Sequence, residues 1–516
     1  MTFHHWRRPD SVVRYGNLVA IALLALYFFI IPAFLVVYFL ADPNLRGSGV
    51  PKMAWWAHRS LTPKYQHWAA ERLSRGTVNA NTEDISGTEW PLFGSVFYLW
   101  ATESLQEAWE QGDRRVATAP AVYARDAIEA AAALVTDPGH AAWVEKHWGK
   151  EYLHKEDAFY RMLLISAMTS HAKLLGSDRY LPALRDQVES LSDELDRSPS
   201  GLLNDYPDQC YPTDVLATIA AIRRADTVLG TDHSRFVARA RRAFEGACLD
   251  PATGLPPYDA IAESGRPLSC ARGCGNSYMA LNAPQLWPET AVQWYALYEK
   301  HFWQYRLTAY GFREFPKGAP GNEWYMDVDS GPVIAGHGTA ASAFGVGAAR
   351  LNGRFDHAWP LSAEMITTCC PLADGALAGP RVLSNAINAP YLGEAAILYF
   401  LTRQPAPEAV LRQGGQLPPF VPILLAGYLL LGALFLFAAF LRHRQWRKQP
   451  PNRPPLAGVQ LALWMGLLIA GAWLTIGGHW IPGLAMLLAA QLLPRGGGKL
   501  EARDQAKADE SSGRGA

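Results

Sequence analysis

Two long uncharged apolar runs, one near each end of the chain, constrain this sequence most. The first, at 18–40, reads LVAIALLALYFFIIPAFLVVYFL, and the second, at 420–441, reads FVPILLAGYLLLGALFLFAAFL. About 20 apolar residues are enough to cross a bilayer as a helix. The first run exceeds the core of a signal peptide and ends in Ala41-Asp42-Pro43, so it predicts an uncleaved anchor. A third run at 456–476 predicts another span, and a shorter one at 481–493 is marginal for a crossing.

Basic residues predict the orientation of these segments. They cluster before the first run, directly after the second, and after the fourth: Arg7, Arg8, Arg14; Arg442, Arg444, Arg447, Lys448, Arg453; Arg495, Lys499. Basic flanks stay in the cytoplasm. The sequence therefore predicts a multi-pass protein of the cytoplasmic membrane with residues 41–415 on the outer side.

Four parts follow from this topology. Residues 1–45 form the cytoplasmic N-terminus and anchor, 46–415 an extracytoplasmic domain, 416–495 a C-terminal membrane region, and 496–516 a polar, disordered tail. The 47 basic and 47 acidic residues balance, which excludes the basic excess of a nucleic-acid binder. No CxxC pair or zinc-type histidine spacing occurs, so no zinc site is predicted, and the sequence assigns no cofactor.

The extracytoplasmic part is predicted to be all-α. Helical periodicity covers nine segments, and strict strand alternation is nearly absent: 88–111, 119–135, 156–175, 181–196, 214–228, 234–247, 288–305, 338–351 and 388–402. Leu175-Gly176-Ser177-Asp178 is echoed 54 positions later by Leu229-Gly230-Thr231-Asp232, and again near Leu351-Asn352-Gly353. Each echo ends an apolar helix with a glycine turn and starts an amphipathic helix, as capping chemistry requires. A period of this length predicts stacked helical hairpins, about six in all, and hence an (α/α)6 toroid.

The densest polar loop lies between two of these helices, at 204–214. It holds Asp205, Tyr206, Asp208 and Cys210, whereas an ordinary inter-helix loop needs only small or turn-forming residues. Carboxylates near a phenol can divide acid and base roles when one of them is desolvated. These four are therefore candidate catalytic residues, while Asp214 is interpreted as a helix N-cap.

A second candidate loop spans 326–338. Asp327 and Asp329 alternate in a segment predicted to be extended, so that both side chains point the same way. His337 is expected to open the next helix and is a natural acid/base group near neutral pH. Glu314 is a candidate substrate-binding residue of the same group. The Asp-x-Asp pattern also fits a divalent cation, although as a bare pattern it is weak.

Two further stretches supply candidate substrate-binding residues. Glu156 begins an apolar helix, where an acidic residue also serves as a cap, and Tyr160 follows within the helix. Asn276 and Tyr278 follow a glycine-rich turn at 269–275. That turn either lends backbone N–H groups to a ligand or is closed by a Cys270–Cys274 disulfide.

The region 150–400 resembles the linalool dehydratase/isomerase family. The resemblance rests on Lys155-Glu156-Asp157 with Tyr160, then on 175–180, then on Tyr206 and Gln209-Cys210 leading into a helix. It continues through 250–254 and 263–265 to Asp327-Val328-Asp329-Ser330-Gly331. It implies an (α/α)6 barrel and cofactor-independent elimination or isomerisation of an allylic terpene alcohol, with Cys210 at the position of an active-site cysteine.

The chain departs from the family at two positions. No second cysteine occurs between Gly201 and Gln209, and Leu163 stands where the family has a histidine. The carboxylates, more than the thiol, are then expected to carry the chemistry.

We therefore expect a membrane-anchored acid/base lyase or isomerase acting on a small alcohol or lipid-like substrate. One alternative is a carbohydrate-active enzyme of the cell envelope, since paired carboxylates also suit glycosidic cleavage. Another is a non-catalytic binding module of an envelope complex. The sequence leaves the oligomeric state open.

Overall fold

A computed structural model describes residues 9–76, 83–319, 323–385, 387–448, 458–476 and 480–492. Contacts divide the chain into two compact units. The larger unit comprises residues 36–371 and 377–424, and the smaller one comprises 1–35, 372–376 and 425–516. The predicted tail at 496–516 lies outside the described residues.

The larger unit is mostly helical, as the sequence predicts. Its helices are α3 (Lys52–Arg75), α4 (Ile85–Glu110), α5 (Pro120–Tyr123), α6 (Arg125–Thr136), α7 (Ala142–Trp148), α8 (Ala158–Leu175), α9 (Leu181–Arg197), α10 (Pro212–Leu229), α11 (Ser234–Ala247), α12 (Gly273–Leu286), α13 (Pro288–Phe302), α14 (Thr339–Leu351), α15 (Phe355–Cys369), α16 (Ala378–Leu383) and α17 (Leu392–Thr402). Short 3-10 turns occupy 43–46, 138–141 and 152–154.

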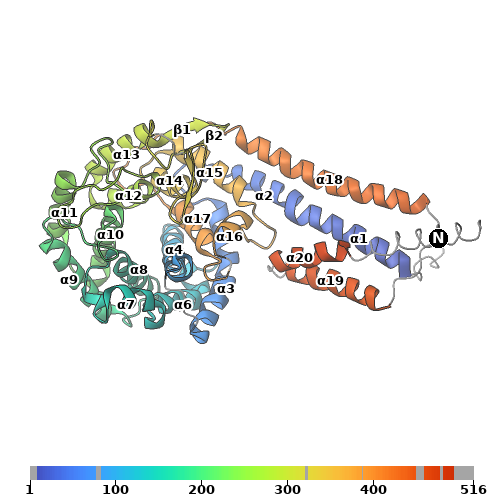
Figure 1. The fold of residues 1–516 in the computed structure, drawn as a ribbon, viewed down its shortest axis with the longest axis horizontal. Helices are drawn as coiled ribbons and strands as arrows, with labels where there is room; N and C mark the ends of the chain where they lie inside the picture. Colours follow the sequence, from blue (N-terminus) through green and yellow to red (C-terminus); the bar gives the residue numbers. More distant parts are fainter. Residues whose placement is uncertain are drawn as a thin grey trace, which may run out of the picture. The chain divides into compact units, whose positions relative to one another are not determined.

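Six of these helices contact one another in a closed circuit. α4 packs against α8, α8 against α10, α10 against α12, α12 against α14, α14 against α17, and α17 against α4 (Figure 1). Sixteen of the eighteen residues of α8 are buried, which fits its apolar character on most faces. The other long helices of this unit pack against the circuit or its neighbours: α3 and α6 near α4, α9 on α8, α11 on α9 and α10, α13 on α12, and α15 on α14.

Glycine caps end the helices where the internal echoes predict them. Gly176 ends α8 and Gly230 ends α10, both in the left-handed conformation that glycine adopts without strain. The predicted capping at the following helix starts is not found. Tyr180 and His233 are the N-cap residues of α9 and α11, and neither makes a side-chain cap hydrogen bond.

Several predicted helix bounds need correction. The helix predicted at 119–135 breaks at Ala124, between α5 and α6. The one predicted at 288–305 ends at Phe302, because the chain continues into a strand. The long helix at 52–75 was missed; it contains Pro63, which reads in sequence as a helix break. The helices at 273–286 and 355–369 were indicated only by the glycine turns before them, without bounds.

The described residues also contain five short strands, where the sequence indicates almost none. β1 (Trp303–Arg306) pairs with β2 (Ala309–Phe312), and β3 (Trp324–Asp327) with β4 (Gly331–Ile334), which pairs with β5 (His337–Gly338), all antiparallel. The β1–β2 turn places Leu307 and Thr308 at positive φ without a glycine or asparagine. A turn of this kind leaves none of the usual hairpin signatures in the sequence.

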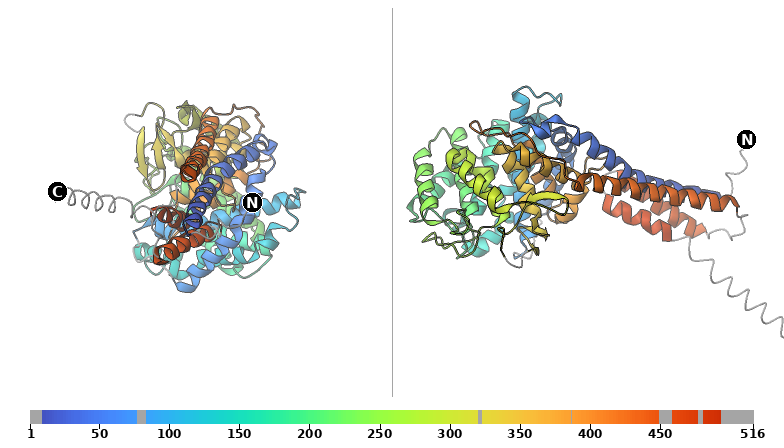
Figure 2. Two further views of the ribbon diagram at one scale, coloured as in Figure 1. Left: turned by 90° about the vertical axis from the view of Figure 1, so that its right-hand side faces the viewer. Right: turned by 90° about the horizontal axis from the view of Figure 1, so that it is seen from above.

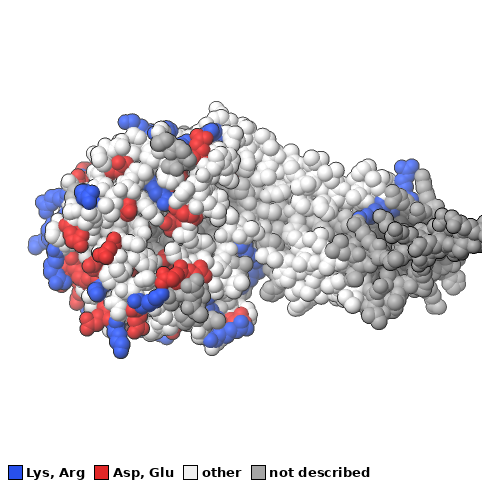
Figure 3. Space-filling model, in the orientation of Figure 1, with Lys and Arg blue, Asp and Glu red and all other residues white. Residues whose placement is uncertain are grey.

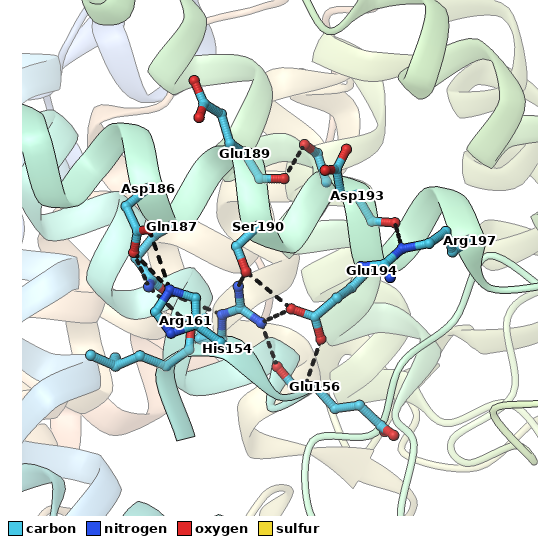
Figure 4. A network of polar contacts seen from close by, with 12 residues as sticks. His154, Glu156, Arg161, Asp186, Gln187, Glu189, Ser190, Asp193, Glu194 and Arg197 are labelled. Atoms are coloured by element: carbon cyan, nitrogen blue, oxygen red, sulfur yellow. Dashed lines mark hydrogen bonds and ion pairs between the residues drawn. The ribbon is translucent and has the colours of Figure 1, made fainter. Parts of the chain in front are cut away.

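Arg161 ties α8 to α9 and to the loop that precedes α8. Its side chain is fully buried and donates to Gln187 Oε1 at 3.0 Å, Ser190 Oγ at 2.9 Å and Glu194 Oε1 at 2.6 Å (Figure 4). It also donates to the backbone oxygen of Glu156 at 3.2 Å. Glu156 and Asp157 both have positive φ, so this network holds a strained segment at the start of α8.

Most residues of the long apolar helices belong to the smaller unit, and each of the two longest continues a few residues into the larger one. The first run forms α1 (Pro9–Ala25), a π-helical turn at Leu26–Ile30 and α2 (Ile31–Leu40) without a break, and the second forms α18 (Phe420–Lys448). The π turn adjoins Pro32, whose missing N–H interrupts the α-helical pattern. Phe29 stacks on Phe435 at 5.5 Å between ring centroids, and the two long helices run side by side (Figure 2).

Two helices are long and apolar enough to cross a membrane, Tyr15–Leu40 and Phe420–Arg444. α19 (Gly458–Ile476) and α20 (Trp480–Leu492) pack against each other, and their apolar stretches in the described residues are shorter. Charged side chains of both signs are interspersed on the face of the larger unit that Figure 3 shows. The described part of α18 carries no charge before Arg442.

Replacing Arg161 by leucine is expected to lower the apparent melting temperature of the whole chain. The substitution leaves Glu194 and Gln187 without their buried partner, and breaking a buried ion pair costs about 3–5 kcal/mol. Thermal unfolding in detergent at one scan rate measures the effect. Arg185→Leu is the matched control, because its ion pair with Glu189 is exposed and 4.0 Å long. Equal losses in both variants would contradict this account of the network.

Candidate functional site

Carboxyl groups gather where the helices of the circuit begin. Glu89 is the fifth residue of α4, Asp157 is the N-cap of α8, and Asp214 is the third residue of α10. Asp329 lies in the turn between β3 and β4, shortly before α14. The positive ends of helix dipoles favour carboxylates at such positions. We refer to Glu89, Asp157, Asp205, Asp214 and Asp329 as the acidic cluster.

Glu89 is the member most affected by the others. Burial raises the pKa of Glu89 well above its usual value, and the charges of Asp329, Asp214 and Asp157 raise it further. Its side chain keeps some solvent-accessible surface. Among the described residues it has no hydrogen-bond or ion-pair partner. Glu89 is therefore held as a neutral carboxyl with a proton available to a ligand.

Asp214 has a pKa close to neutral pH. Burial, followed by the charge of Asp329, raises the pKa of Asp214 to about 7. The N-cap of α10 is Tyr211, so Asp214 lies inside the helix and its interpretation as an N-cap is wrong. In the described part of the chain its carboxylate accepts no hydrogen bond. A group with this pKa can both accept and donate a proton under physiological conditions.

Asp157 and Asp205 are almost completely buried, at 0% and 1% exposure. Burial raises the pKa of both well above the usual value. Asp205 Oδ2 accepts from the backbone N–H of Tyr211 at 2.8 Å, but Oδ1 has no described partner. One oxygen of Asp157 is likewise without a partner among these residues. Both carboxyls are therefore held in their neutral form.

Asp329 is tied to a pair of tyrosines. The Tyr258 hydroxyl donates to Asp329 Oδ2 at 2.6 Å, and the Tyr258 ring lies 5.2 Å from that of Tyr211. Burial raises the pKa of Asp329, whereas the hydrogen bond from Tyr258 opposes that rise. Asp329 is thus the member whose ionised form receives the most direct support from a neighbour.

Arg272, the residue before α12, forms ion pairs with two further acidic residues, Glu314 and Asp327. Its Nε donates to Glu314 Oε1 at 2.7 Å, and its Nη2 lies 2.8 Å from Asp327 Oδ2. The guanidinium stacks over the Tyr258 ring at 4.4 Å from the centroid. Glu314 is fully buried, and burial raises its pKa to about 7 despite Arg272. This arginine links the Glu314–Asp327 pair to the acidic cluster through Tyr258.

The structure brings some of the predicted residues together. Asp205 and Asp329 belong to the acidic cluster, and Asp327 and Glu314 meet at Arg272. Asp327 and Asp329 do not alternate in an extended segment as predicted. Asp327 ends β3, and its Oδ1 accepts from the N–H groups of Asp329 and Ser330 at 3.1 and 2.7 Å. The segment therefore turns at this point.

Other predicted residues have different surroundings. Asp208 is exposed at the tip of a tight turn, with φ of 63°. Tyr206 packs on the rings of Trp143 and His147. Cys210 is fully buried, and burial raises the pKa of its thiol. His337 lies in β5 instead of opening a helix, and its Nε2 is 3.1 Å from the backbone oxygen of Arg306.

The remaining candidates are largely engaged with protein. Glu156 accepts from the backbone N–H of Asn204 at 3.0 Å, and the buried Tyr160 contacts the rings of Trp143 and Tyr152. Asn276 donates to the backbone oxygen of Pro256 at 3.0 Å, but its Oδ1 has no partner in the described residues. Tyr278 is buried between Phe93 and Phe344.

The cysteine alternatives are also decided by the geometry. Cys270 and Cys274 are both free thiols, so no Cys270–Cys274 disulfide is present. Cys270 is exposed, whereas Cys274 lies in the first turn of α12 and donates to Glu314 Oε1 at 3.1 Å. The glycine of that turn has a packing role, because a Cβ at Gly273 would meet the backbone oxygen of Arg313 at 1.9 Å.

Four important residues were not predicted from the sequence: Glu89, Asp214, Tyr258 and Arg272. Glu89 and Asp214 each lie in the first turns of an apolar helix, and that position was the available signal. Tyr258 and Arg272 carry no local signal, since their partners are distant in sequence. No group of three or more His, Cys, Asp or Glu in the described ranges is arranged to hold a metal ion.

Comparison with known protein families and with curated proteins finds no match for this chain.

The raised pKa of Asp214 gives a prediction on stability and pH. Between its usual value of 3.8 and about 7, the folded chain keeps a proton that the unfolded chain releases. Stability from this group is therefore present at low pH and is lost as pH rises toward 7. Asp214→Asn should raise the free energy of unfolding at pH 8 by about 1–3 kcal/mol, and the apparent melting temperature should rise with it. At pH 4 the substitution should change both quantities little.

Thermal unfolding from pH 4 to 8 measures this effect. Asp208→Asn is the control, because Asp208 is exposed in its turn and asparagine tolerates the same left-handed backbone. A difference between Asp214→Asn and the unmodified chain that stays constant with pH would refute the assignment.

Proposed function

We propose that this protein is a membrane-anchored acid/base enzyme, a lyase or isomerase that acts on a small hydroxyl-bearing substrate. The six-helix circuit with its outer helices supports the proposal that the domain is an (α/α)6 toroid. The acidic cluster then lies at the end of the inner ring where the helices begin. The observation that carries the proposal is Glu89, a neutral carboxyl with no described partner, beside Asp214, whose pKa is about 7.

The two carboxyls fit an elimination with balanced protons. Glu89 donates its proton to the substrate hydroxyl oxygen, and the carbon–oxygen bond breaks to release water. The ionised form of Asp214 takes a proton from the adjacent carbon, and that electron pair forms the double bond. Transfer of one proton from Asp214 to Glu89, directly or through water, restores the starting state. The same groups in reverse add water at another carbon, which is an isomerisation.

The neighbours of these carboxyls have positioning roles in this scheme. Tyr258 donates to Asp329, so its hydroxyl is fixed next to the reacting groups. Arg272 is engaged with Glu314 and Asp327 and stays outside the proton transfer. Cys210, which the family resemblance would place in the chemistry, is buried with a raised thiol pKa and has no role here.

A glycan substrate is the second candidate. The Tyr211–Tyr258 ring pair next to several carboxyls is a surface on which a sugar ring can stack, and paired carboxyl groups can cleave a glycosidic bond. Elimination from an alcohol is favoured because Glu89 and Asp214 combine a neutral acid with a base near pH 7. Product analysis separates the two, since glycan cleavage releases a reducing sugar and dehydration releases an alkene.

The proposed location is the cytoplasmic membrane, with the main domain on the outer side. Two helices of sufficient length and apolarity support it, together with the basic clusters in the sequence.

Glu89→Gln should reduce turnover by about 10²–10⁴-fold, the usual contribution of a positioned general acid. The full chain in detergent is incubated with linalool and with a panel of small alcohols and oligosaccharides, and products are identified by mass spectrometry. Asp208→Asn should keep full activity. The proposal fails if no substrate of the panel is dehydrated or isomerised, or if Glu89→Gln retains the activity found.

Cys270 offers a test of sidedness, because it is exposed while Cys370 is half-buried and the other four cysteines are buried. In a Cys370→Ser background, a membrane-impermeant maleimide should label intact spheroplasts as strongly as lysed ones. Adding Cys270→Ser should abolish the labelling. Labelling that appears only after lysis would place the domain in the cytoplasm.

A further inference from the structure

A polar cavity of about 180 Å³ lies among five helices of the circuit, and most of its lining comes from their C-terminal halves. These are α4, α8, α10, α12 and α17, and apart from Ala217 the lining lies toward the helix ends that are far from Glu89 and Asp214. Its lining comprises Trp100, Glu103, Ser104, Glu107, Lys173, Ala217, Ala221, Arg224, Asn282, Gln285, Tyr399 and Arg403. The proposed chemistry makes no use of this cavity.

Most charges in the lining are paired. Glu103 Oε2 accepts from Arg224 at 2.7 Å and from Ser170 at 2.9 Å, and its other oxygen accepts from Lys173. Burial alone would raise the pKa of Glu103, but Arg224 and Lys173 lower it to about 2. Lys173 also reaches Glu107 at 3.3 Å. Two acids are thus neutralised by two bases.

Arg403 is the exception. Its guanidinium lies 5.1 Å from the centre of the Tyr399 ring and has no carboxylate or other acceptor among the described residues. Its Nε is buried without a hydrogen-bond partner. The cavity therefore has one positive charge that the described lining does not balance.

Further donors in the cavity lack acceptors. Trp100 is only 5% exposed, and its Nε1 is buried with no partner in the described residues. The Tyr399 hydroxyl makes no hydrogen bond there either, and the Trp100 and Tyr399 rings lie 5.1 Å apart. A buried donor without an acceptor costs about 1–3 kcal/mol, so the Arg403 Nε and Trp100 Nε1 groups in one cavity indicate a missing acceptor.

We propose that this cavity binds a small oxyanion, a carboxylate or a phosphate, with Arg403 as its counter-ion. A ligand with several acceptor oxygens satisfies the orphaned donors and balances the charge together. A cavity of about 150 Å³ accommodates a molecule the size of benzene, so the ligand has about six to ten non-hydrogen atoms. The site is independent of the proposed enzymatic activity.

The negative ends of the helices do not account for Arg403 on their own. Cations near helix C-termini are favourable when they hydrogen-bond the last carbonyl groups. The guanidinium of Arg403 donates to none in the described residues, whereas its own backbone oxygen accepts from Arg350 at 2.9 Å. The side chain therefore remains available to a ligand.

Calorimetric titration of the full chain in neutral detergent tests the site. Inorganic phosphate and malonate are the two probes, each measured against sodium chloride at the same ionic strength. At least one is expected to bind saturably, and the probe that binds identifies the ligand as phosphate or carboxylate. Arg403→Gln should weaken binding at least tenfold, and Arg185→Gln, an exposed arginine elsewhere, should leave it unchanged.

Two further variants keep the result interpretable. Tyr399→Phe removes one donor and keeps the ring, so it should weaken binding several-fold even if Arg403→Gln does not fold. Glu89→Gln should bind the probe as the unmodified chain does, which separates this site from the proposed catalytic one. Binding of neither anion beyond chloride, or equal binding after Arg403→Gln and Tyr399→Phe, would show that the cavity holds only water.

Discussion

Burial of several carboxyl groups close to one another is the constraint that governs this domain. The closed circuit of helices brings Glu89, Asp157, Asp205, Asp214 and Asp329 within electrostatic reach of one another. A helix N-terminus stabilises a carboxylate by about 0.3–1 kcal/mol at an exposed position. Burying an unpaired ionised carboxylate costs several times more, so the group takes up a proton instead. The buried members of the cluster are consequently protonated carboxyl groups rather than fixed negative charges.

The same constraint explains why the start of α8 needs support. Glu156 and Asp157 adopt left-handed backbone conformations that cost about 1–3 kcal/mol each. Arg161 and Glu194 hold this segment from the side of α9, where Glu194 Oε2 accepts the N–H of Glu156 at 2.8 Å. The buried ion pair thus stabilises the backbone geometry that delivers Asp157 to the cluster.

The sequence was sufficient where structure follows from local chemistry. The amphipathic pattern of 181–196 and 234–247 matches α9 and α11 within one residue, and the glycines of the first two internal echoes, Gly176 and Gly230, are C-caps. Loop composition located Asp205 and Asp329. It could not locate Tyr258 or Arg272, because their significance depends on contacts across tens of residues, with Asp329 and Glu314. The β1–β2 hairpin was missed because its Leu307-Thr308 turn is formed against the local preference of both residues.

The two ends of the circuit differ in a way that dipoles alone do not explain. Acids at the helix starts and bases at the helix ends both follow the direction of the helix dipole. If compensation were the only role, each charge would be satisfied by nearby backbone or by a counter-charge, as Glu103 is by Arg224 and Lys173. Glu89 at one end and Arg403 at the other have no such partner among the described residues. A partly buried polar group without a partner lowers stability. Glu89 and Arg403 therefore each lower the free energy of unfolding, and no contact with a neighbouring residue compensates for the loss. A cost of that kind persists when the group serves a ligand, and here the two ligand chemistries differ: a proton-accepting hydroxyl beside Glu89 and an anion beside Arg403.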